Sequence, residues 1–209
     1  MFVDIEGRLC VVVGGGRVAE DRVRKLVDHG AIVRLVSPEI TTRLDEMATA
    51  GLIPDLRRRI YEPADLDGCV LAVAATDAAS VNRAVAVDAR ARGVLCNVVD
   101  DPARGDVIVP SLVRRGDLAV AITTGGASPA VASHVRAELE RVFGPEWDAL
   151  LEMLREVRGA LKVQYPDSAE RSAMVRGLFD GPVLALFADG RNADARRAAA
   201  EILRVEVPG

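Results

Sequence analysis

VVVGGGRVAEDRV, residues 11–23, puts three glycines between a run of valines and a charged stretch of helical spacing. The valines are typical of a short buried strand, and the apolar residues that follow recur with the helical period. Gly14, Gly16 and Ala19 fit the pattern G-x-G-x-x-G/A, whose positions serve a tight turn, a close backbone approach to a pyrophosphate and close helix packing. The stretch therefore predicts strand, turn and helix, with the phosphates of a dinucleotide at the helix N-terminus.

The same alternation continues through the first hundred residues. Apolar runs predict strands, and runs of helical period that stop at glycine predict helices. The expected strands are 8–13, 31–37, 55–60, 69–75 and 94–99, and the expected helices are 17–30, 40–51 and 76–93. This order predicts an α/β fold with a Rossmann-like, doubly wound parallel sheet.

The pattern changes after Asp100. Residues 106–124 contain two strand-like pieces joined by RRGD, residues 128–144 read as a helix capped by Ser128, and the rest is helical with breaks at YPDS, FDGP and FADGRN. We expect a dinucleotide-binding domain over 1–106, a β/α dimerisation and substrate region over 107–144, and a helical domain over 145–209. The central strands are too few for a sheet with its own core, so we expect a homodimer.

Composition excludes several classes of protein. Lys and Arg number 27 against 31 Asp and Glu, a net charge of −4, so no nucleic-acid partner is expected. No signal pattern or apolar run of about 20 residues is present, so we expect no membrane partner and a cytoplasmic location. The three cysteines lie in apolar runs, and neither histidine has a partner at metal-ligand spacing, so no metal site is expected. The cluster Arg57–Arg59 indicates a solvated strand end or turn rather than a nucleic-acid site.

Polar residues follow the expected strands at the sheet edge where ligands bind. Ser37 stands where an acidic residue would usually accept the ribose hydroxyls, and Glu39 comes two residues later, so the residues alone leave NAD and NADP open. For Asp77 we favour a helix cap, although cofactor contact is the alternative. The expected cofactor-binding set is Gly14, Gly15, Gly16, Arg17, Val18, Ala19, Ser37, Pro38, Glu39, Thr76, Asp77, Asn97 and Val99.

Two further features suggest substrate chemistry. Asp100 ends a core strand where the alternating pattern breaks, which predicts a carboxylate in an interdomain crevice; a turn residue is the alternative. TTGGASP, residues 123–129, is a second glycine-rich turn that could present N–H groups and hydroxyls to carboxylates, unless it is a plain capped turn. The expected substrate-binding set is Arg104, Arg114, Thr123, Thr124, Gly125, Gly126, Ser128 and Arg136.

Five segments taken in order resemble one known family: VVVGGGRVA, LAVAATD, NVVDDP, VPSLVRRGDLAVAITTGGASPAVA and a following LE. The chain resembles the precorrin-2 dehydrogenase/sirohydrochlorin ferrochelatase family, the dehydrogenase module of siroheme synthase, over at least residues 2–143. The resemblance implies NAD as cofactor, oxidation of precorrin-2 to sirohydrochlorin, and in some members insertion of ferrous iron as a second substrate. It also implies an intertwined dimer with the tetrapyrrole site between domains.

The resemblance assigns roles to single residues. The family's key aspartate matches Asp100, which is therefore the expected catalytic residue, and a phosphorylatable position matches Thr124. The chain departs from the family at VAEDR, where VAERK is usual, and at Ser133, where a basic residue is common. The family's methyltransferase domain is not in the sequence, which predicts a standalone enzyme. The alternatives are a dehydrogenase without the chelatase step, another NAD(P) oxidoreductase, which leaves TTGGASP unexplained, and a non-catalytic NAD-sensing regulator, which would usually carry a DNA-reading element.

Overall fold

The computed structural model describes residues 3–208, and the chain divides between Val109 and Pro110 into two compact units. We refer to them as the N-terminal unit and the C-terminal unit. The finer boundaries expected at residues 106 and 144 stay predictions.

The N-terminal unit is built on a parallel sheet of five strands within the described residues, in the order β3-β2-β1-β4-β5. The strands are β1 Leu9–Val13, β2 Ile32–Val36, β3 Asp55–Arg57, β4 Leu71–Ala74 and β5 Leu95–Val98. The chain first winds outward from β1 to β3 and then returns to β4 on the other side of β1. The carboxyl ends of β1 and β4 therefore flank the point where the winding direction reverses, which is where open α/β sheets bind ligands.

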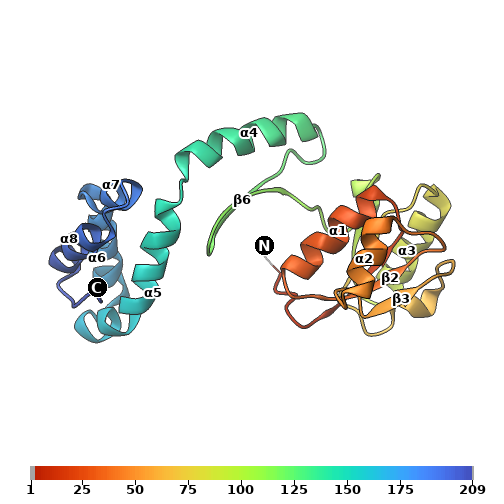
Figure 1. The fold of residues 1–209 in the computed structure, drawn as a ribbon, viewed down its shortest axis with the longest axis horizontal. Helices are drawn as coiled ribbons and strands as arrows, with labels where there is room; N and C mark the ends of the chain where they lie inside the picture. The colour runs from red at the N-terminus through yellow and green to blue at the C-terminus, as the bar shows by residue number, and fades with distance from the viewer. Residues whose placement is uncertain (1–2, 209) are drawn as a thin grey trace. The chain divides into compact units, whose positions relative to one another are not determined.

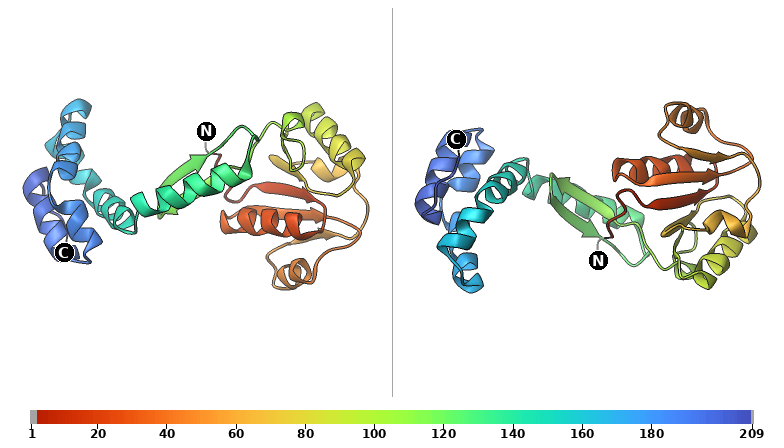
Figure 2. Two further views of the ribbon diagram at one scale, coloured as in Figure 1. Left: turned by 90° about the horizontal axis from the view of Figure 1, so that it is seen from above. Right: turned by 90° about the horizontal axis from the view of Figure 1, so that it is seen from below.

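Helices cover both faces of this sheet (Figures 1 and 2). On one face, α1 (Arg17–Asp28) and α2 (Thr42–Thr49) share a core with Val12, Leu35 and Val73. On the other face, α3 (Ala79–Ala91) and the 3-10 turn η1 (Pro63–Leu66) pack on Val11 and Ala72. The alternate residues of β1 thus enter opposite cores, which explains why the run of valines is continuous. The expected α/β fold is confirmed.

The cluster Arg57–Arg59 is not a simple solvated strand end. Arg57 Nη1 and Arg59 Nη2 each donate to Asp65 Oδ1 at 2.6 Å, and the Asp65 side chain is fully buried. Burial alone would raise the pKa of this carboxyl, but hydrogen bonds from Arg59, the Glu62 backbone and Arg57 outweigh it and hold the pKa below its usual value. The ion pairs of Arg57 and Arg59 with Asp65 therefore hold the end of β3 against η1.

The cysteines behave as the sequence predicted. Cys10, Cys69 and Cys96 are free and buried, and burial raises the pKa of both Cys10 and Cys96 to about 11. They act as small hydrophobic residues of the two sheet faces.

The C-terminal unit starts with a hairpin of β6 (Ser111–Arg115) and β7 (Leu118–Ile122), in which Val113 pairs with Val120. Gly116 turns the hairpin with a φ of +53°. Helix α4 (Pro129–Val142) packs on both strands. The remaining helices, α5 Glu146–Gln164, α6 Ser168–Asp180, α7 Val183–Ala188 and α8 Asn192–Leu203, share a separate core and break at the three places expected from the sequence. Among the residues that the structure describes, no helix is long and apolar enough to cross a membrane.

Candidate functional site

A pocket of about 720 Å³ lies at the carboxyl ends of the strands of the N-terminal unit. Residues that directly follow β1, β2, β4 and β5 line it together, although they are far apart in the sequence. The lining residues are Val13, Gly14, Gly15, Gly16, Arg17, Val18, Val36, Ser37, Pro38, Glu39, Ile40, Thr41, Ile60, Tyr61, Ala75, Thr76, Asp77, Ala78, Val81, Val99 and Asp100. We call this the dinucleotide pocket.

The three glycines have different structural tasks. Gly14 has a φ of +120°, and a Cβ added there would lie 2.3 Å from the carbonyl oxygen of Ala75. A Cβ on Gly15 would lie 1.9 Å from the carbonyl oxygen of Glu39. A Cβ on Gly16 would meet nothing within 4 Å, although Gly16 lines the pocket. The first two glycines therefore let the turn fit between neighbouring loops, and the third keeps the space over helix α1 clear.

The N-terminus of α1 is suited to an anion. Gly16 is its N-cap residue, and no side chain of the described protein caps the helix. The first N–H groups and the positive end of the helix dipole are therefore available to phosphate oxygens. Arg17 is the one basic residue that lines the pocket among the described residues. Ala19 is fully buried and packs α1 on the sheet, so it shapes the motif without lining the pocket.

The end of β2 shapes another part of the pocket. Ser37 is 7% exposed, and its hydroxyl donates to the carbonyl oxygen of Glu39 at 2.6 Å. The Glu39 side chain is exposed at the pocket wall. Among the lining residues that follow β2, Glu39 is therefore the one with an acidic side chain, because Ser37 stands at the position where an acidic residue is usual.

The structure adds lining residues that the sequence reasoning missed. Ile60 is 73% exposed and lines the pocket, which suits it to contact an apolar ring. Tyr61 follows it, and its hydroxyl donates to Asp88 at 3.0 Å. Burial and the Asp88 carboxylate together raise the pKa of Tyr61, so it stays protonated. The other lining residues outside the expected set are Val13, Val36, Ile40, Thr41, Ala75, Ala78 and Val81.

The loop after β4 places Thr76 and Asp77 at the pocket. Asn82 fixes this loop, because its Nδ2 donates to the Thr76 carbonyl at 2.8 Å and its Oδ1 accepts from the Thr76 hydroxyl at 2.7 Å. The interpretation of Asp77 as a helix cap is wrong: Ala78 is the N-cap of α3, and no side-chain cap is formed. Asp77 is exposed instead and lines the pocket.

Asp100 lines the dinucleotide pocket with an exposed side chain. Within the described residues it has no hydrogen bond or ion pair. Its neighbour Asp101 accepts from Arg104 Nε at 2.6 Å and thus takes the turn-forming role. Asn97 lies elsewhere: it is 5% exposed, and its Nδ2 donates to the Val107 carbonyl at 2.8 Å, so it fastens the returning chain to β5 rather than lining the pocket.

The other residues expected to bind substrate lie in the C-terminal unit. Thr124 Oγ1 accepts from the N–H of Ser128 at 3.1 Å, and the Ser128 hydroxyl caps α4 by accepting from Val131 at 3.3 Å. Thr123 Oγ1 accepts from the N–H of Gly125 at 3.1 Å, and Gly125 and Gly126 both have positive φ. The local geometry is that of a capped turn, and its contact with substrate stays a prediction.

The two arginines expected to bind substrate in this unit have local partners. Arg136 donates to Glu140 at 2.5 Å. Arg114 Nε donates to the Gly116 carbonyl at 3.1 Å. A role of either side chain toward substrate also stays a prediction.

The reversal of the sheet at β1 and β4, the glycine turn and the uncapped helix N-terminus define a dinucleotide-binding protein of the Rossmann class. A family model described as putative NAD(P)-binding matches residues 1–111, so the chain belongs to this putative NAD(P)-binding family. A second model, described as sirohaem biosynthesis protein central, matches residues 115–141.

Curated relatives agree with both models. A siroheme synthase of Chromobacterium violaceum is 40% identical over 196 residues, which are 94% of this chain and 42% of that protein. A siroheme synthase of Stutzerimonas stutzeri is 36% identical over 208 residues, which are 44% of that protein. The chain thus spans less than half the length of these relatives. The resemblance to the dehydrogenase module of siroheme synthase is confirmed.

A solved structure shares the fold of nearly the whole chain. It is described as SirC, precorrin-2 dehydrogenase, and superimposes with a TM-score of 0.75 at 21% sequence identity. The match covers 96% of this chain and 98% of that one.

Proposed function

We propose that the chain is an NAD-dependent dehydrogenase that oxidises precorrin-2 to sirohydrochlorin. The observation that supports this most is that one pocket contains both the glycine turn and the exposed Asp100 carboxylate. The matched siroheme synthases and the fold shared with a precorrin-2 dehydrogenase support the choice of substrate.

The residues of the pocket fit the parts of NAD. The N–H groups at the start of α1 and Arg17 would hold the pyrophosphate, and Glu39 would accept from ribose hydroxyls. The chemistry that NAD supplies when bound is acceptance of a hydride from the substrate. Loss of two hydrogens also releases a proton, and Asp100 is the base that we assign to take it. An exposed carboxylate without a protein partner is free for this role.

A direct assay tests the proposal. Purified protein is mixed with precorrin-2 and NAD, and absorbance is followed with and without Fe²⁺. We expect sirohydrochlorin to form with NAD alone. A further change that needs Fe²⁺ would assign chelation as a second reaction, for which Asp100 could accept pyrrole protons. Binding of NAD without oxidation would favour the NAD-sensing regulator.

We predict that NAD supports turnover better than NADP by about tenfold or more in kcat/KM, because like charges that face each other across a binding site are costly. Glu39 lies at the end of β2 in the pocket wall, where it would repel a 2′-phosphate. Initial rates at varied concentrations of each cofactor measure the ratio. Equal values, or a preference for NADP, would contradict this assignment of Glu39.

We predict that the protein is a homodimer. Within the described residues β6 and β7 pair only with each other, and most of their side chains are partly exposed despite helix α4. A two-stranded sheet is marginal in water, so a second copy is the expected completion. Light scattering at micromolar concentration measures the mass in solution. An active monomer would refute the proposed dimer.

A further inference from the structure

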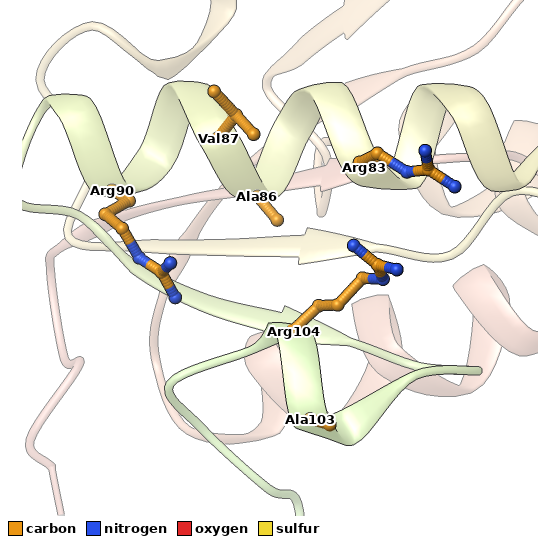
Figure 3. Close-up of a pocket in the computed structure, with 6 residues that line it drawn as sticks. All are labelled: Arg83, Ala86, Val87, Arg90, Ala103 and Arg104. Atoms are coloured by element: carbon orange, nitrogen blue, oxygen red, sulfur yellow. The ribbon is translucent and has the colours of Figure 1, made fainter.

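A second pocket of the N-terminal unit, of about 310 Å³, lies between α3 and the 3-10 turn η2 (Pro102–Arg104) (Figure 3). Its lining residues are Arg83, Ala86, Val87, Arg90, Ala103 and Arg104. We call it the arginine pocket. It shares no lining residue with the dinucleotide pocket, and none of its lining residues is acidic.

The pocket combines an apolar middle with cationic ends. Arg83, Ala86, Val87 and Arg90 are spaced i, i+3, i+4 and i+7, so they follow one face of α3. Val87 is 62% exposed, which is unusual for an apolar residue at the centre of such a face. Figure 3 shows Arg83 and Arg90 at the two ends of this face and Arg104 coming from η2 across the pocket. The arrangement suits a ligand with an apolar frame and anionic groups at separate points.

The positive charge of the pocket is only partly compensated. Arg104 uses Nε to bind Asp101 at 2.6 Å, and the nearest acidic oxygen to Arg90 is Asp106 Oδ1 at 3.9 Å. Arg83 has no ion pair with any described residue. A guanidinium has five N–H donors, so most of the donors around the pocket have no carboxylate partner. This concentration of positive charge is local, because the whole chain has a net charge of −4.

Another pocket of the same unit, of about 330 Å³, also contains arginines but differs in its charge balance. It has the same number of arginines, but its acidic residues balance them: Arg17, Arg24 and Arg43 face Glu20, Asp21 and Asp28. Arg24 binds Asp21 at 2.8 Å, and Arg43 binds Glu46 at 3.0 Å. That pocket therefore offers matched variants for comparison.

We propose that the arginine pocket binds a small molecule that carries two or more carboxylates on an apolar frame. Guanidinium groups match carboxylates with two parallel hydrogen bonds, and Ala86, Val87 and Ala103 would contact the frame. The carboxylates could belong to a free polycarboxylic acid or to the edge of a tetrapyrrole; the second source rests on the proposed function. Arg104, which the sequence already predicted as a substrate contact, lies four residues after Asp100. The short segment 100–104 therefore links the lining of the dinucleotide pocket to that of the arginine pocket.

The test titrates the full chain without NAD at low salt. The probes are tricarballylate, uroporphyrin and inorganic phosphate, and heat or fluorescence reports binding. We expect Arg83→Gln and Arg104→Gln each to weaken binding of a carboxylate probe by about tenfold, as loss of a charge-assisted contact should. Arg24→Gln and Arg43→Gln should leave it unchanged. All four side chains are exposed, and melting temperatures verify that each variant folds.

The probes separate the sources. Arginine-dependent binding of uroporphyrin but not tricarballylate assigns the pocket to a tetrapyrrole edge, whereas binding of both assigns it to polycarboxylates in general. The proposal is overturned if neither carboxylate binds, if the Arg83 and Arg104 variants bind as well as the parent, or if phosphate binds as tightly as the carboxylates. Because no cofactor or turnover is involved, failure of the dehydrogenase assay would leave this result standing, and the reverse also holds.

Discussion

A Gly16→Asp variant is expected to fold normally and to lose NAD affinity by about 10²-fold or more, since like charges across a binding site cost several kcal/mol. A Cβ at this position meets nothing within 4 Å, and aspartate is a favoured N-cap residue, so α1 should tolerate the change. The new carboxylate would occupy the helix N-terminus, where the pyrophosphate is expected to bind. Calorimetric titration of NAD into the folded variant measures the loss.

Two other substitutions separate the causes. Gly16→Asn adds nearly the same volume without the charge, so it should weaken NAD binding less than Gly16→Asp. Gly15→Ala should instead damage the fold, because its Cβ would lie 1.9 Å from the Glu39 carbonyl oxygen. Unchanged NAD affinity in folded Gly16→Asp would show that the phosphates do not approach this turn.

The sequence was sufficient for most of the sheet because β1 and β4 are continuous apolar runs and β2 and β5 are each interrupted by a single polar residue. The short strand β3, Asp55–Arg57, has one apolar residue and was expected to be longer. The strand expected at 8–13 is β1 at Leu9–Val13, and the one expected at 94–99 is β5 at Leu95–Val98. Burial on both faces requires such runs, and local turn signals limit them. The positions that directly follow these strands, such as Ser37 and Val99, were therefore also predictable as pocket residues.

Residues brought to the pocket by long-range packing were not predictable in this way. Ile60 and Tyr61 lie in an irregular stretch after β3, and no local pattern relates them to the glycine turn. Asn97 looked equivalent to Val99, but Asn97 lies within β5 and its amide donates to the returning chain at Val107, whereas Val99 follows the end of the strand and lines the pocket. Asp77 resembled a helix cap because it precedes a run of helical spacing, but Ala78 is the N-cap and α3 starts one residue later than a cap at Asp77 would require. The amide of Asn82 holds the carbonyl of Thr76 in the loop before the helix.

An Asp100→Ala variant is expected to keep its fold and its NAD affinity but to oxidise precorrin-2 about 10²-fold or more slowly, as loss of a general base should. Asp100 is exposed, lines the dinucleotide pocket, and has no bond to another described residue that its removal would break. Its loss should therefore cost little stability. Single-turnover oxidation at saturating NAD, measured with melting temperature and NAD affinity on the same sample, tests all three expectations.

The neighbouring Asp101 gives the matched control. It accepts from Arg104 at 2.6 Å within the same connection, so Asp101→Ala removes an equal charge and a real turn contact. If the carboxylate at position 100 only shaped this connection, Asp100→Ala should behave like Asp101→Ala, with a lower melting temperature and near-normal oxidation. If Asp100 is the base, the two variants should differ by the full rate loss, and Asp100→Ala should be the more stable of the two because it breaks no turn contact. Wild-type oxidation by a folded Asp100→Ala protein would end the catalytic assignment of Asp100.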